Sequence, residues 1–487
     1  MAGLKEIDFA AIESSFASNI REGGRFKIGH VLSPFVGVIL FGTNPVLWHL
    51  AVTSAGVITC LLFYAAARQA GADKTSSLLF VLLFAVTGGQ NSVWYRLLTG
   101  ETWGMLLAAI AVWAIVKAAR RATPSFWDGV AILAMVLMAT FKESFILLIP
   151  AMLLLRWAMQ RWFNEQSWRQ SLLALHRPLI AGGIIFSLFL LTTIGILRYI
   201  PDGYGARVAG LSARSFDPGA WFDLLVNSDM APLTYGLPLF VILLLVIYRH
   251  RHLAYQHLLS VVMVIIAWVI PQLILHGSGI AGHYQFPAVV GLAGLWGLTL
   301  SLLWREQQRI LWTAGAIWAV GLILINVNPT IENSSYYTAD TLALQDMIYH
   351  LAENVGPEQS IIIIADPNVQ FEGAISLRTH LHSAGLSSGV YLLPVFPAET
   401  ETEGALATEL LNIHFAGFTD LESLHPTEVG AIIGLKAPTP TTPIPSWYIP
   451  TTWQEETFSH PYYNFSLAQF RYVKTGAVGY TILLPTT

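Results

Sequence analysis

Long apolar runs alternate with short polar connections along the chain as far as Ile325. About ten of these runs are candidates for membrane-spanning helices, which need roughly 20 residues each. They are Val46–Ala67, Ser77–Tyr95, Thr102–Lys117, Trp127–Phe141, Phe145–Met159, Leu179–Leu197, Leu233–Tyr248, Leu258–Leu275, Phe286–Leu303 and Ile310–Ile325. The pattern predicts a polytopic α-helical membrane protein.

The charged residues are concentrated in the gaps between the apolar runs, and the gaps alternate in kind. The intervening gaps are polar, Gly-rich or acidic, whereas the basic gaps hold Arg68 with Lys74, Lys117–Arg121, Arg156–Arg177, Arg249–Arg251 and Arg305 with Arg309. Cytoplasmic loops of membrane proteins carry an excess of Lys and Arg. The basic gaps are therefore predicted to be cytoplasmic, and both ends of the chain non-cytoplasmic, in the plasma (inner) membrane.

Composition agrees with a membrane protein. Of 487 residues, 54% are hydrophobic and only 11% are charged, whereas soluble domains are about one quarter charged. The single cysteine, Cys60, excludes an intrachain disulfide. No basic stripe of the kind that binds nucleic acid is present, so the expected partners are membrane lipids and not nucleic acid.

The chain is predicted to have three parts. Residues 1–44 form a first outer loop and a juxtamembrane segment, residues 45–327 the transmembrane domain, and residues 328–487 a soluble extracytoplasmic domain. The last part contains sixteen Asp or Glu residues but only four Lys or Arg residues, namely Arg378, Lys436, Arg471 and Lys474. Its apolar runs are the length of strands and not of membrane spans.

The C-terminal part is predicted to be an α/β domain. The β-branched run Ser360–Ala365 ends at Asp366–Pro367–Asn368, which is typical of a buried strand and a turn. Helices are expected at Ala339–Asn354 and Gly373–Ala384, and a second strand at Gly389–Val395. A hairpin is expected over Gln469–Leu484, with its turn around Lys474–Gly476.

Ionisable residues gather on the face predicted to be outer. Asp8 lies in an amphipathic segment ahead of the membrane, Glu101 opens a span, and Lys142 lies in a tight outer turn before the next run. His283 precedes another span. The long outer loop Arg198–Ala231 carries three arginines, against the trend of the other outer loops, and this favours anion binding there.

These residues, in this order, resemble the GT-C superfamily of membrane glycosyltransferases, of the protein mannosyltransferase and aminoarabinose transferase kind. Asp8 stands where those enzymes carry an acidic residue in the first outer loop. Arg25–Asn44 resembles their stretch along the membrane, FKESFILLIP around Lys142 their Lys-containing turn, and HYQFPAVVGLAGLWG from His283 their late span. The resemblance covers most of Met1–Ile325. The family's first span would precede Asp8, and a span upstream of Met1 would explain a polar N-terminus outside the cell.

The resemblance implies a transferase that moves a sugar from a polyprenyl-phosphate donor to a glycan, lipid or protein acceptor. A carboxylate can accept the proton of the acceptor hydroxyl, and cations can stabilise the departing phosphate. The implied catalytic residues are Asp8 and Glu101. The implied phosphate-binding residues are Lys142, His283, Arg207, Arg214 and Arg25. No cofactor is assigned, and a divalent metal is compatible with this chemistry.

Simpler interpretations stand beside these assignments. Asp8 also fits a solvated helix residue, Glu101 a charge favoured by a helix N-terminus, Lys142 an ion pair with Glu143 or a side chain reaching for the membrane surface, and His283 an interfacial cap. The loop arginines also suit lipid headgroups.

Two other functions remain open. A non-catalytic GT-C-like subunit that scaffolds a membrane or envelope complex would suit the lack of a paired acidic motif near Asp8. A transporter is the second alternative, but the sequence has no duplicated half of the kind that many transporters show.

Overall fold

The computed structural model describes residues 17, 27–42, 44–87, 93–94, 100–199, 216–227, 231–234, 268–276, 286–356, 358–365, 371–386, 389–394, 429–435, 453–466, 469 and 471–485. The chain divides into two compact units, Met1–Thr330 and Ile331–Thr487. The helix α18 belongs to both, because it runs from Arg309 to Asn354.

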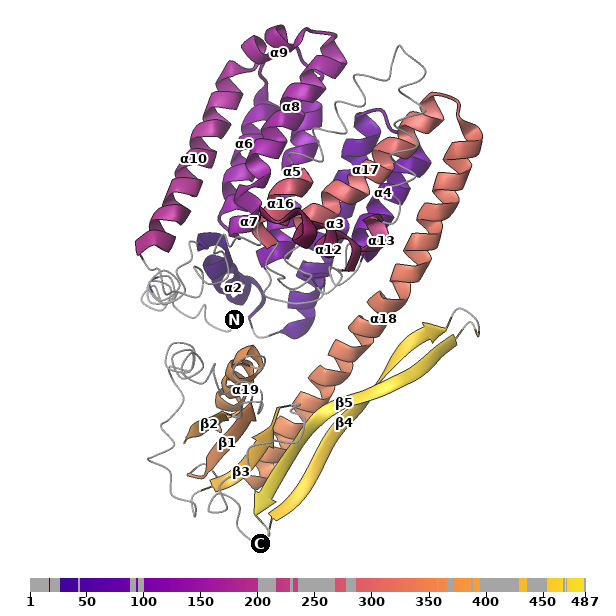
Figure 1. Ribbon diagram of the computed structural model, residues 1–487. Helices are drawn as coiled ribbons and strands as arrows, with labels where there is room; N and C mark the ends of the chain where they lie inside the picture. Colours follow the sequence, from indigo (N-terminus) through magenta and orange to yellow (C-terminus); the bar gives the residue numbers. More distant parts are fainter. Residues whose placement is uncertain are drawn as a thin grey trace. The chain divides into compact units, whose positions relative to one another are not determined.

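The first unit is helical (Figure 1). Its described helices are α2 (Ile28–Phe41), α3 (Pro45–Gln69), α4 (Lys74–Val86), α5 (Gly100–Ala119), α6 (Phe126–Ala139), α7 (Glu143–Ile146), α8 (Leu148–Asn164), α9 (Trp168–Ala174), α10 (His176–Tyr199), α12 (Pro218–Asn227), α13 (Ala231–Thr234), α16 (Ile270–His276), α17 (Phe286–Arg305) and the first part of α18 (Arg309–Asn354).

Six helical segments of the described chain are long and apolar enough to cross a membrane. They lie in α3, α5, the α7–α8 pair, α10, α17 and α18, while α2, α4 and α6 are apolar but shorter. The prediction of a polytopic α-helical membrane protein is confirmed, and the chain is an integral membrane protein. Most of the predicted spans Leu233–Tyr248 and Leu258–Leu275 lies outside the described residues.

One predicted span is too long. The run Ser77–Tyr95 was expected to be a single helix, but α4 ends at Val86 and its C-cap, Thr87, is extended. Two glycines follow Thr87 in the sequence. Glycine costs a helix interior about 1 kcal/mol relative to alanine, so hydropathy alone overestimates the helix here.

The helix α5 lies at the centre of the bundle, in contact with α3, α6 and α8. Its alanines are fully buried, among them Ala108, Ala111, Ala114 and Ala118. Small side chains let helix backbones approach closely, which is how helices associate in lipid. At Gly104 an added Cβ would lie 2.6 Å from the ring of Phe145, so this contact requires glycine.

The bundle has two chemically different ends. At the first, the Arg120 guanidinium donates to the carbonyl of Gln69, 2.6 Å away, and the guanidinium of Arg305 lies 6.0 Å from the Trp162 ring. We call this the basic end. At the other end α5 and α7 begin, at Gly100 and Glu143, and we call it the Glu101 end. Among the described residues, the gaps after α3, α5, α8 and α17 thus meet at one end of the bundle, while Arg249–Arg251 lie outside the described residues.

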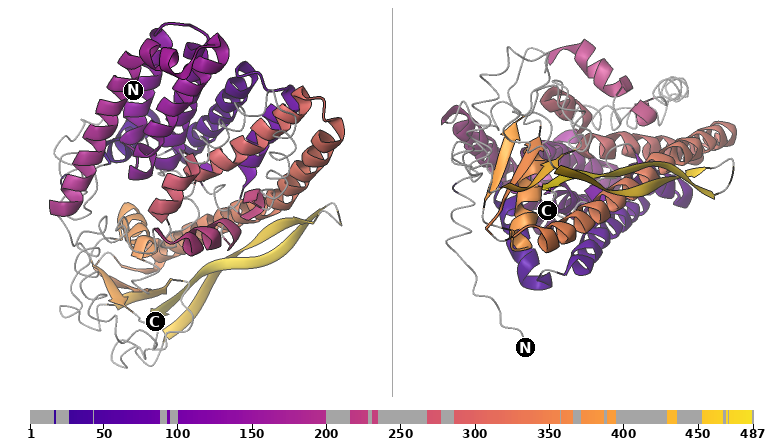
Figure 2. Two further views of the ribbon diagram at one scale, coloured as in Figure 1. Left: turned by 45° about the horizontal axis from the view of Figure 1, so that its top comes forward. Right: turned by 90° about the horizontal axis from the view of Figure 1, so that it is seen from below.

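The second unit is an α/β domain, as predicted. Its sheet has the order β2-β1-β3-β5-β4, with parallel pairing among the first three strands and antiparallel pairing among the last three. The strands are β1 (Ser360–Ala365), β2 (Val390–Pro394), β3 (Val429–Gly434), β4 (Trp453–Ser466) and β5 (Arg471–Pro485). The end of α18 and α19 (Phe371–Ser383) pack on the sheet and share its main core. Figure 2 shows the long β4–β5 hairpin from two further sides.

The predicted hairpin over Gln469–Leu484 is wrong. The segment Lys474–Gly476 is not a turn but part of β5, and the strand that pairs with β5 is β4. The pairing register between β4 and β5 shifts there: Tyr462 lies opposite Gly476, but Tyr463 lies opposite Lys474. This shift is a β-bulge. An added Cβ at Gly476 would lie 2.8 Å from the hydroxyl oxygen of Tyr462. The glycine therefore marks a close approach and not a chain reversal.

Candidate functional site

Two of the predicted site residues, Glu101 and Lys142, fall in the described part of the chain. Asp8, Arg25, Arg207, Arg214 and His283 lie outside the described residues. Glu101 lies in the first turn of α5, and Lys142 is the N-cap of α7, directly after the turn that follows α6. The structure brings these two side chains together.

Lys142 and Glu101 form an ion pair, from the ammonium nitrogen to Oε1 of the carboxylate. Each residue is only 6% exposed. The structure thus gives Lys142 a partner on another helix, 41 residues earlier in the sequence. Removing one partner of such a buried pair is costly, because the other charge remains in a poorly solvated place.

The local chain path explains why the two charges meet. Phe141 donates its N–H to the carbonyl of Met138 and closes a tight turn after α6. Lys142 then adopts an extended backbone, with φ −162° and ψ 147°. The side chain consequently turns from the α6–α7 connection toward the first turn of α5.

A histidine that the sequence analysis did not select lies beside the pair. Gly29 donates its N–H to the carbonyl of Thr140 over 2.9 Å, which fastens the start of α2 to the α6–α7 turn. An added Cβ at Gly100 would lie 3.1 Å from Nδ1 of His30 and 3.1 Å from the carbonyl oxygen of Phe141. Glycine at position 100 therefore allows three segments to meet at the start of α5.

His30 is neutral under ordinary conditions. Burial, followed by the charge of Lys27, lowers the pKa of His30 to about 4. His30 lies in α2, whose 14 residues are too few to span a membrane. Near neutral pH the ring therefore offers one hydrogen-bond donor and one acceptor, and it does not act as a cation.

Two polar oxygens at this end have no hydrogen-bond partner among the described residues. Gln272 in α16 is 1% exposed, and its Nε2 donates to the carbonyl of Ser144 over 3.0 Å. Its Oε1 has no donor in the described chain, and neither has Oε1 of Glu143. A buried acceptor that lacks a donor costs free energy, and such oxygens can receive hydrogen bonds from a hydroxylated ligand.

An apolar cavity of about 270 Å³ lies within the bundle, among α3, α4, α5, α8 and α17. Phe63, Phe80, Leu154 and Trp268 are among its lining residues, and Arg305 lies at its basic end. Trp268 precedes Gln272 by four residues, about one helical turn. Trp268 is thus the lining residue that comes nearest in sequence to Gln272.

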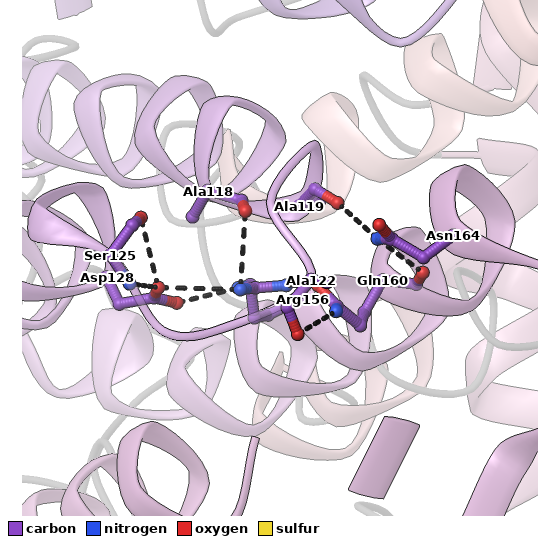
Figure 3. Close-up of polar contacts among 8 residues, drawn as sticks. All are labelled: Ala118, Ala119, Ala122, Ser125, Asp128, Arg156, Gln160 and Asn164. Carbon is purple, nitrogen blue, oxygen red and sulfur yellow. Dashed lines mark hydrogen bonds and ion pairs between the residues drawn. The ribbon is translucent and has the colours of Figure 1, made fainter. Parts of the chain in front are cut away.

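A second buried ion pair, which the sequence analysis missed, lies at the basic end. Nε of Arg156 in α8 donates to Oδ1 of Asp128 in α6 over 2.7 Å, and Nη1 donates to Gln160 over 2.6 Å. Asp128 also accepts the backbone N–H of Ser125 as part of a capping box. Figure 3 shows these side chains converging from two helices. The sequence signal for this pair was a charged residue near one end of each of two predicted spans, Asp128 in Trp127–Phe141 and Arg156 in Phe145–Met159.

The same group closes the C-terminal end of α5. Nη2 of Arg156 reaches the carbonyl of Ala118 at 3.4 Å. Nδ2 of Asn164 donates to the carbonyl of Ala119 over 2.9 Å. The last carbonyls of a helix lack intrahelical partners and carry a partial negative charge, so a cation and an amide stabilise them. We call Asp128, Arg156, Gln160 and Asn164 the clasp.

Among the described residues, no group of three or more His, Cys, Asp or Glu side chains is placed to hold a metal ion.

No protein-family model matches the sequence, and no curated protein matches it. Among solved structures, the chain is similar to ArnT from Cupriavidus metallidurans bound to undecaprenyl phosphate, with 14% identity, a TM-score of 0.48, and coverage of 87% of this chain and 91% of that one. The apo form of the same protein gives a TM-score of 0.44, again at 14% identity and with the same coverage.

The chain is also similar to the oligosaccharyltransferase of Archaeoglobus fulgidus in complex with Zn and sulfate, with 14% identity and a TM-score of 0.39. That similarity covers 84% of this chain and 59% of the other. The fold of the present chain rests on its own helices and sheet, and the chemistry proposed for it rests on its own residues.

Proposed function

We propose that the chain is an integral-membrane glycosyltransferase that moves a sugar from a polyprenyl-phosphate donor to an acceptor at the Glu101 end of the bundle. The observation that carries the proposal is a buried lysine, Lys142, held by Glu101 at the first turn of α5. The sequence resemblance to GT-C enzymes, described above, supports the same function.

Lys142 is suited to a phosphate. A hydrogen bond from a charged donor contributes about 1.5–3 kcal/mol net, and a low local dielectric strengthens it. The N-terminus of α5 adds a partial positive charge at the same place. A lipid phosphate that reaches Lys142 would therefore find a cation and a helix dipole directed at it.

The reaction forms one bond and breaks one. The acceptor hydroxyl oxygen bonds to the anomeric carbon of the sugar, and the bond from that carbon to the phosphate oxygen breaks. The phosphate departs with the electron pair, and Lys142 stabilises its growing charge. Asp8 takes the hydroxyl proton as general base, while Arg25, Arg207, Arg214 and His283 supply further contacts to the donor phosphate.

Glu101 has a positioning role in this scheme. Its carboxylate contacts Lys142, which directs the ammonium toward the start of α5. The oxygens of Gln272 and Glu143 that lack donors in the described chain are suited to hydroxyl groups of the sugar or the acceptor.

The apolar cavity supports a donor with a long hydrocarbon chain. Its lining is mainly aromatic, aliphatic and small residues, and one of them, Trp268, lies about one turn from Gln272. Burying apolar surface contributes about 25 cal/mol per Å². A polyprenyl tail in this cavity would add affinity without adding specificity for the sugar.

A transfer assay tests the proposal. Purified protein in lipid nanodiscs, given a polyprenyl-phosphate-linked sugar and an acceptor, should form product. Asp8→Asn should reduce turnover by roughly 10²–10⁴-fold because it removes the base, with an unchanged unfolding midpoint as evidence of an intact fold. Normal turnover by Asp8→Asn would remove Asp8 from the reaction. No transfer by the wild-type chain with any such donor would favour the scaffold function.

A further inference from the structure

The β4–β5 hairpin is much longer than the sheet to which it belongs. The two strands pair from Trp453 opposite Pro485 to Ser466 opposite Arg471. In contrast, β3 pairs with β5 only at Thr481–Leu483. The far half of the hairpin is thus a two-stranded ribbon beyond the sheet (Figure 1). Such a ribbon is marginally stable unless it packs against something else.

One side of the ribbon lies on α18. His460 contacts Asp346 at 2.7 Å, and Nδ2 of Asn464 donates to Glu332 over 2.8 Å. His460 and Asn464 are successive contact points along β4, and their partners on α18, Asp346 and Glu332, lie successively nearer to the start of the second unit. The far end of the hairpin is therefore joined to the first residues of that unit.

Those first residues are tied to the membrane by the chain itself. The apolar run of α18 ends at Ile325 in the sequence, and Glu332 follows it by seven residues within one continuous helix. At 1.5 Å per residue this separation is about 10 Å. A segment that is hydrogen-bonded to Glu332 is therefore bound to a residue only seven positions beyond the apolar run.

The far end of the hairpin has the chemistry of a membrane interface. Tyr472 is 65% exposed, Tyr463 40% and Val473 37%, and the ring of Phe465 packs edge-on against Tyr472 at 5.4 Å. The exposed rings of Tyr463 and Tyr472 lie on a ribbon over which the described residues place no second sheet. Tyrosine is enriched where membranes meet water, because its ring is apolar and its hydroxyl is polar.

The charge of this patch differs from that of the region around it. From Asn328 to the C-terminus the chain has sixteen acidic residues and four basic ones, and two of those four, Arg471 and Lys474, lie here. Both are exposed. An anionic membrane surface attracts such a basic patch and repels the acidic residues in the rest of the domain.

We propose that this patch, at the far end of the hairpin, is a membrane-surface anchor. Its residues Tyr463, Phe465, Tyr472 and Lys474 lie on one face of the ribbon, and Arg471 and Val473 lie on the other. The rings enter the interfacial layer of the bilayer, and the two cations bind the phosphates of anionic phospholipids. The rest of the domain stays off the surface, because its acidic residues are repelled by the same lipids. The anchor is independent of sugar transfer and of the residues at the Glu101 end.

Spin labels on the full-length chain test the anchor. In a Cys60→Ala background, a label at Gln469, in the turn of the hairpin, replaces none of the six patch residues and removes only the acceptor of Nε of Arg471. A matched label at Thr457 reports the other end of β4. In nanodiscs that contain phosphatidylglycerol, the Gln469 label should collide with oxygen, which concentrates in lipid, more than with a water-soluble nickel chelate. The Thr457 label should show the reverse.

The charge is tested with Arg471→Gln/Lys474→Gln. Each cation near an anionic surface contributes about 1 kcal/mol, so this variant should shift the ratio of docked to undocked hairpin by roughly 25-fold. The wild-type hairpin should show a similar loss of docking in discs of neutral phosphatidylcholine. If the Gln469 label is as open to nickel as the Thr457 label in anionic discs, the anchor is wrong. A label that is immobilised but shielded from oxygen would instead indicate a protein surface over the patch, and would overturn the proposal.

Discussion

Two buried ion pairs lie at opposite ends of one helix bundle, and they are built differently. At the basic end, all three guanidinium nitrogens of Arg156 donate to protein acceptors, two of them to Asp128. At the Glu101 end, Lys142 meets Glu101, and two nearby oxygens, on Gln272 and Glu143, have no donor in the described chain. A fully bonded network specifies structure, whereas a partly bonded one has capacity left for a ligand.

The residue types fit this division. The guanidinium of arginine is a planar fork that can hold several acceptors at once, which suits a permanent connection between helices. Lysine is a compact charge on a flexible chain, and it can follow a phosphate that arrives and departs. The clasp is thus a structural element, and the Glu101 end is the place where chemistry is proposed.

The first prediction places the C-terminal domain and the basic end on opposite sides of the membrane, and its expected effect is all or none. In a Cys60→Ala background, Thr457→Cys in β4 should react with an impermeant thiol reagent in intact cells. Ala122→Cys, beside the clasp, should react only after lysis, because the basic end is predicted to be cytoplasmic. Labelling of Ala122→Cys in intact cells would invert the orientation.

The second prediction removes the clasp. Arg156→Ala leaves the carboxylate of Asp128 buried without its cation, so the free energy of unfolding should fall by roughly 3–5 kcal/mol. The paired replacement Arg156→Met/Asp128→Leu should lose much less, because no charge is left behind. Unfolding of the purified protein in detergent measures both. Equal losses in the two variants would mean that the pair does not act as a unit.

The third prediction fills the cavity near its middle. At Gly294 an added Cβ would meet only Phe80, at 3.9 Å, so Gly294→Leu can enter the cavity without displacing backbone. Loss of space for two or so methylene groups, at about 0.8 kcal/mol each, should weaken binding of a long polyprenyl phosphate by roughly tenfold. A short-chain prenyl phosphate is the control and should bind Gly294→Leu as it binds the wild type. Equal weakening for both ligands would exclude the cavity as the tail site.

The sequence predicted those features that depend on local pattern. Hydropathy predicted most of the described helices of the first unit, and the basic gaps in the sequence indicated the basic end of the bundle. The β-branched run Ser360–Ala365 is strand β1, as predicted. These features follow from residues that are neighbours in the sequence, and periodicity and charge report on such residues directly.

Contacts between distant residues could not be obtained in this way. The pairs Glu101–Lys142 and Asp128–Arg156 join different helices, and their contact depends on how those helices pack. Strand β3 (Val429–Gly434) was missed because a six-residue apolar run has little periodicity. Gly476 was taken for a turn because a glycine required by a bulge cannot be distinguished from a turn glycine in one sequence. The span Ile310–Ile325 and the helix Ala339–Asn354 were predicted as separate elements, but both belong to one continuous helix, α18.

The most direct test of the account is the affinity for a polyprenyl phosphate when each ion pair is removed whole. Glu101→Gln/Lys142→Met and Arg156→Met/Asp128→Leu both delete one cation and one anion, so net charge is constant. Binding in nanodiscs should weaken by roughly ten- to hundred-fold in the first variant, because one charge-assisted hydrogen bond is lost, and should stay at the wild-type value in the second. Unchanged binding in Glu101→Gln/Lys142→Met, or an equal loss in both variants, would contradict the assignment of the phosphate to the Glu101 end.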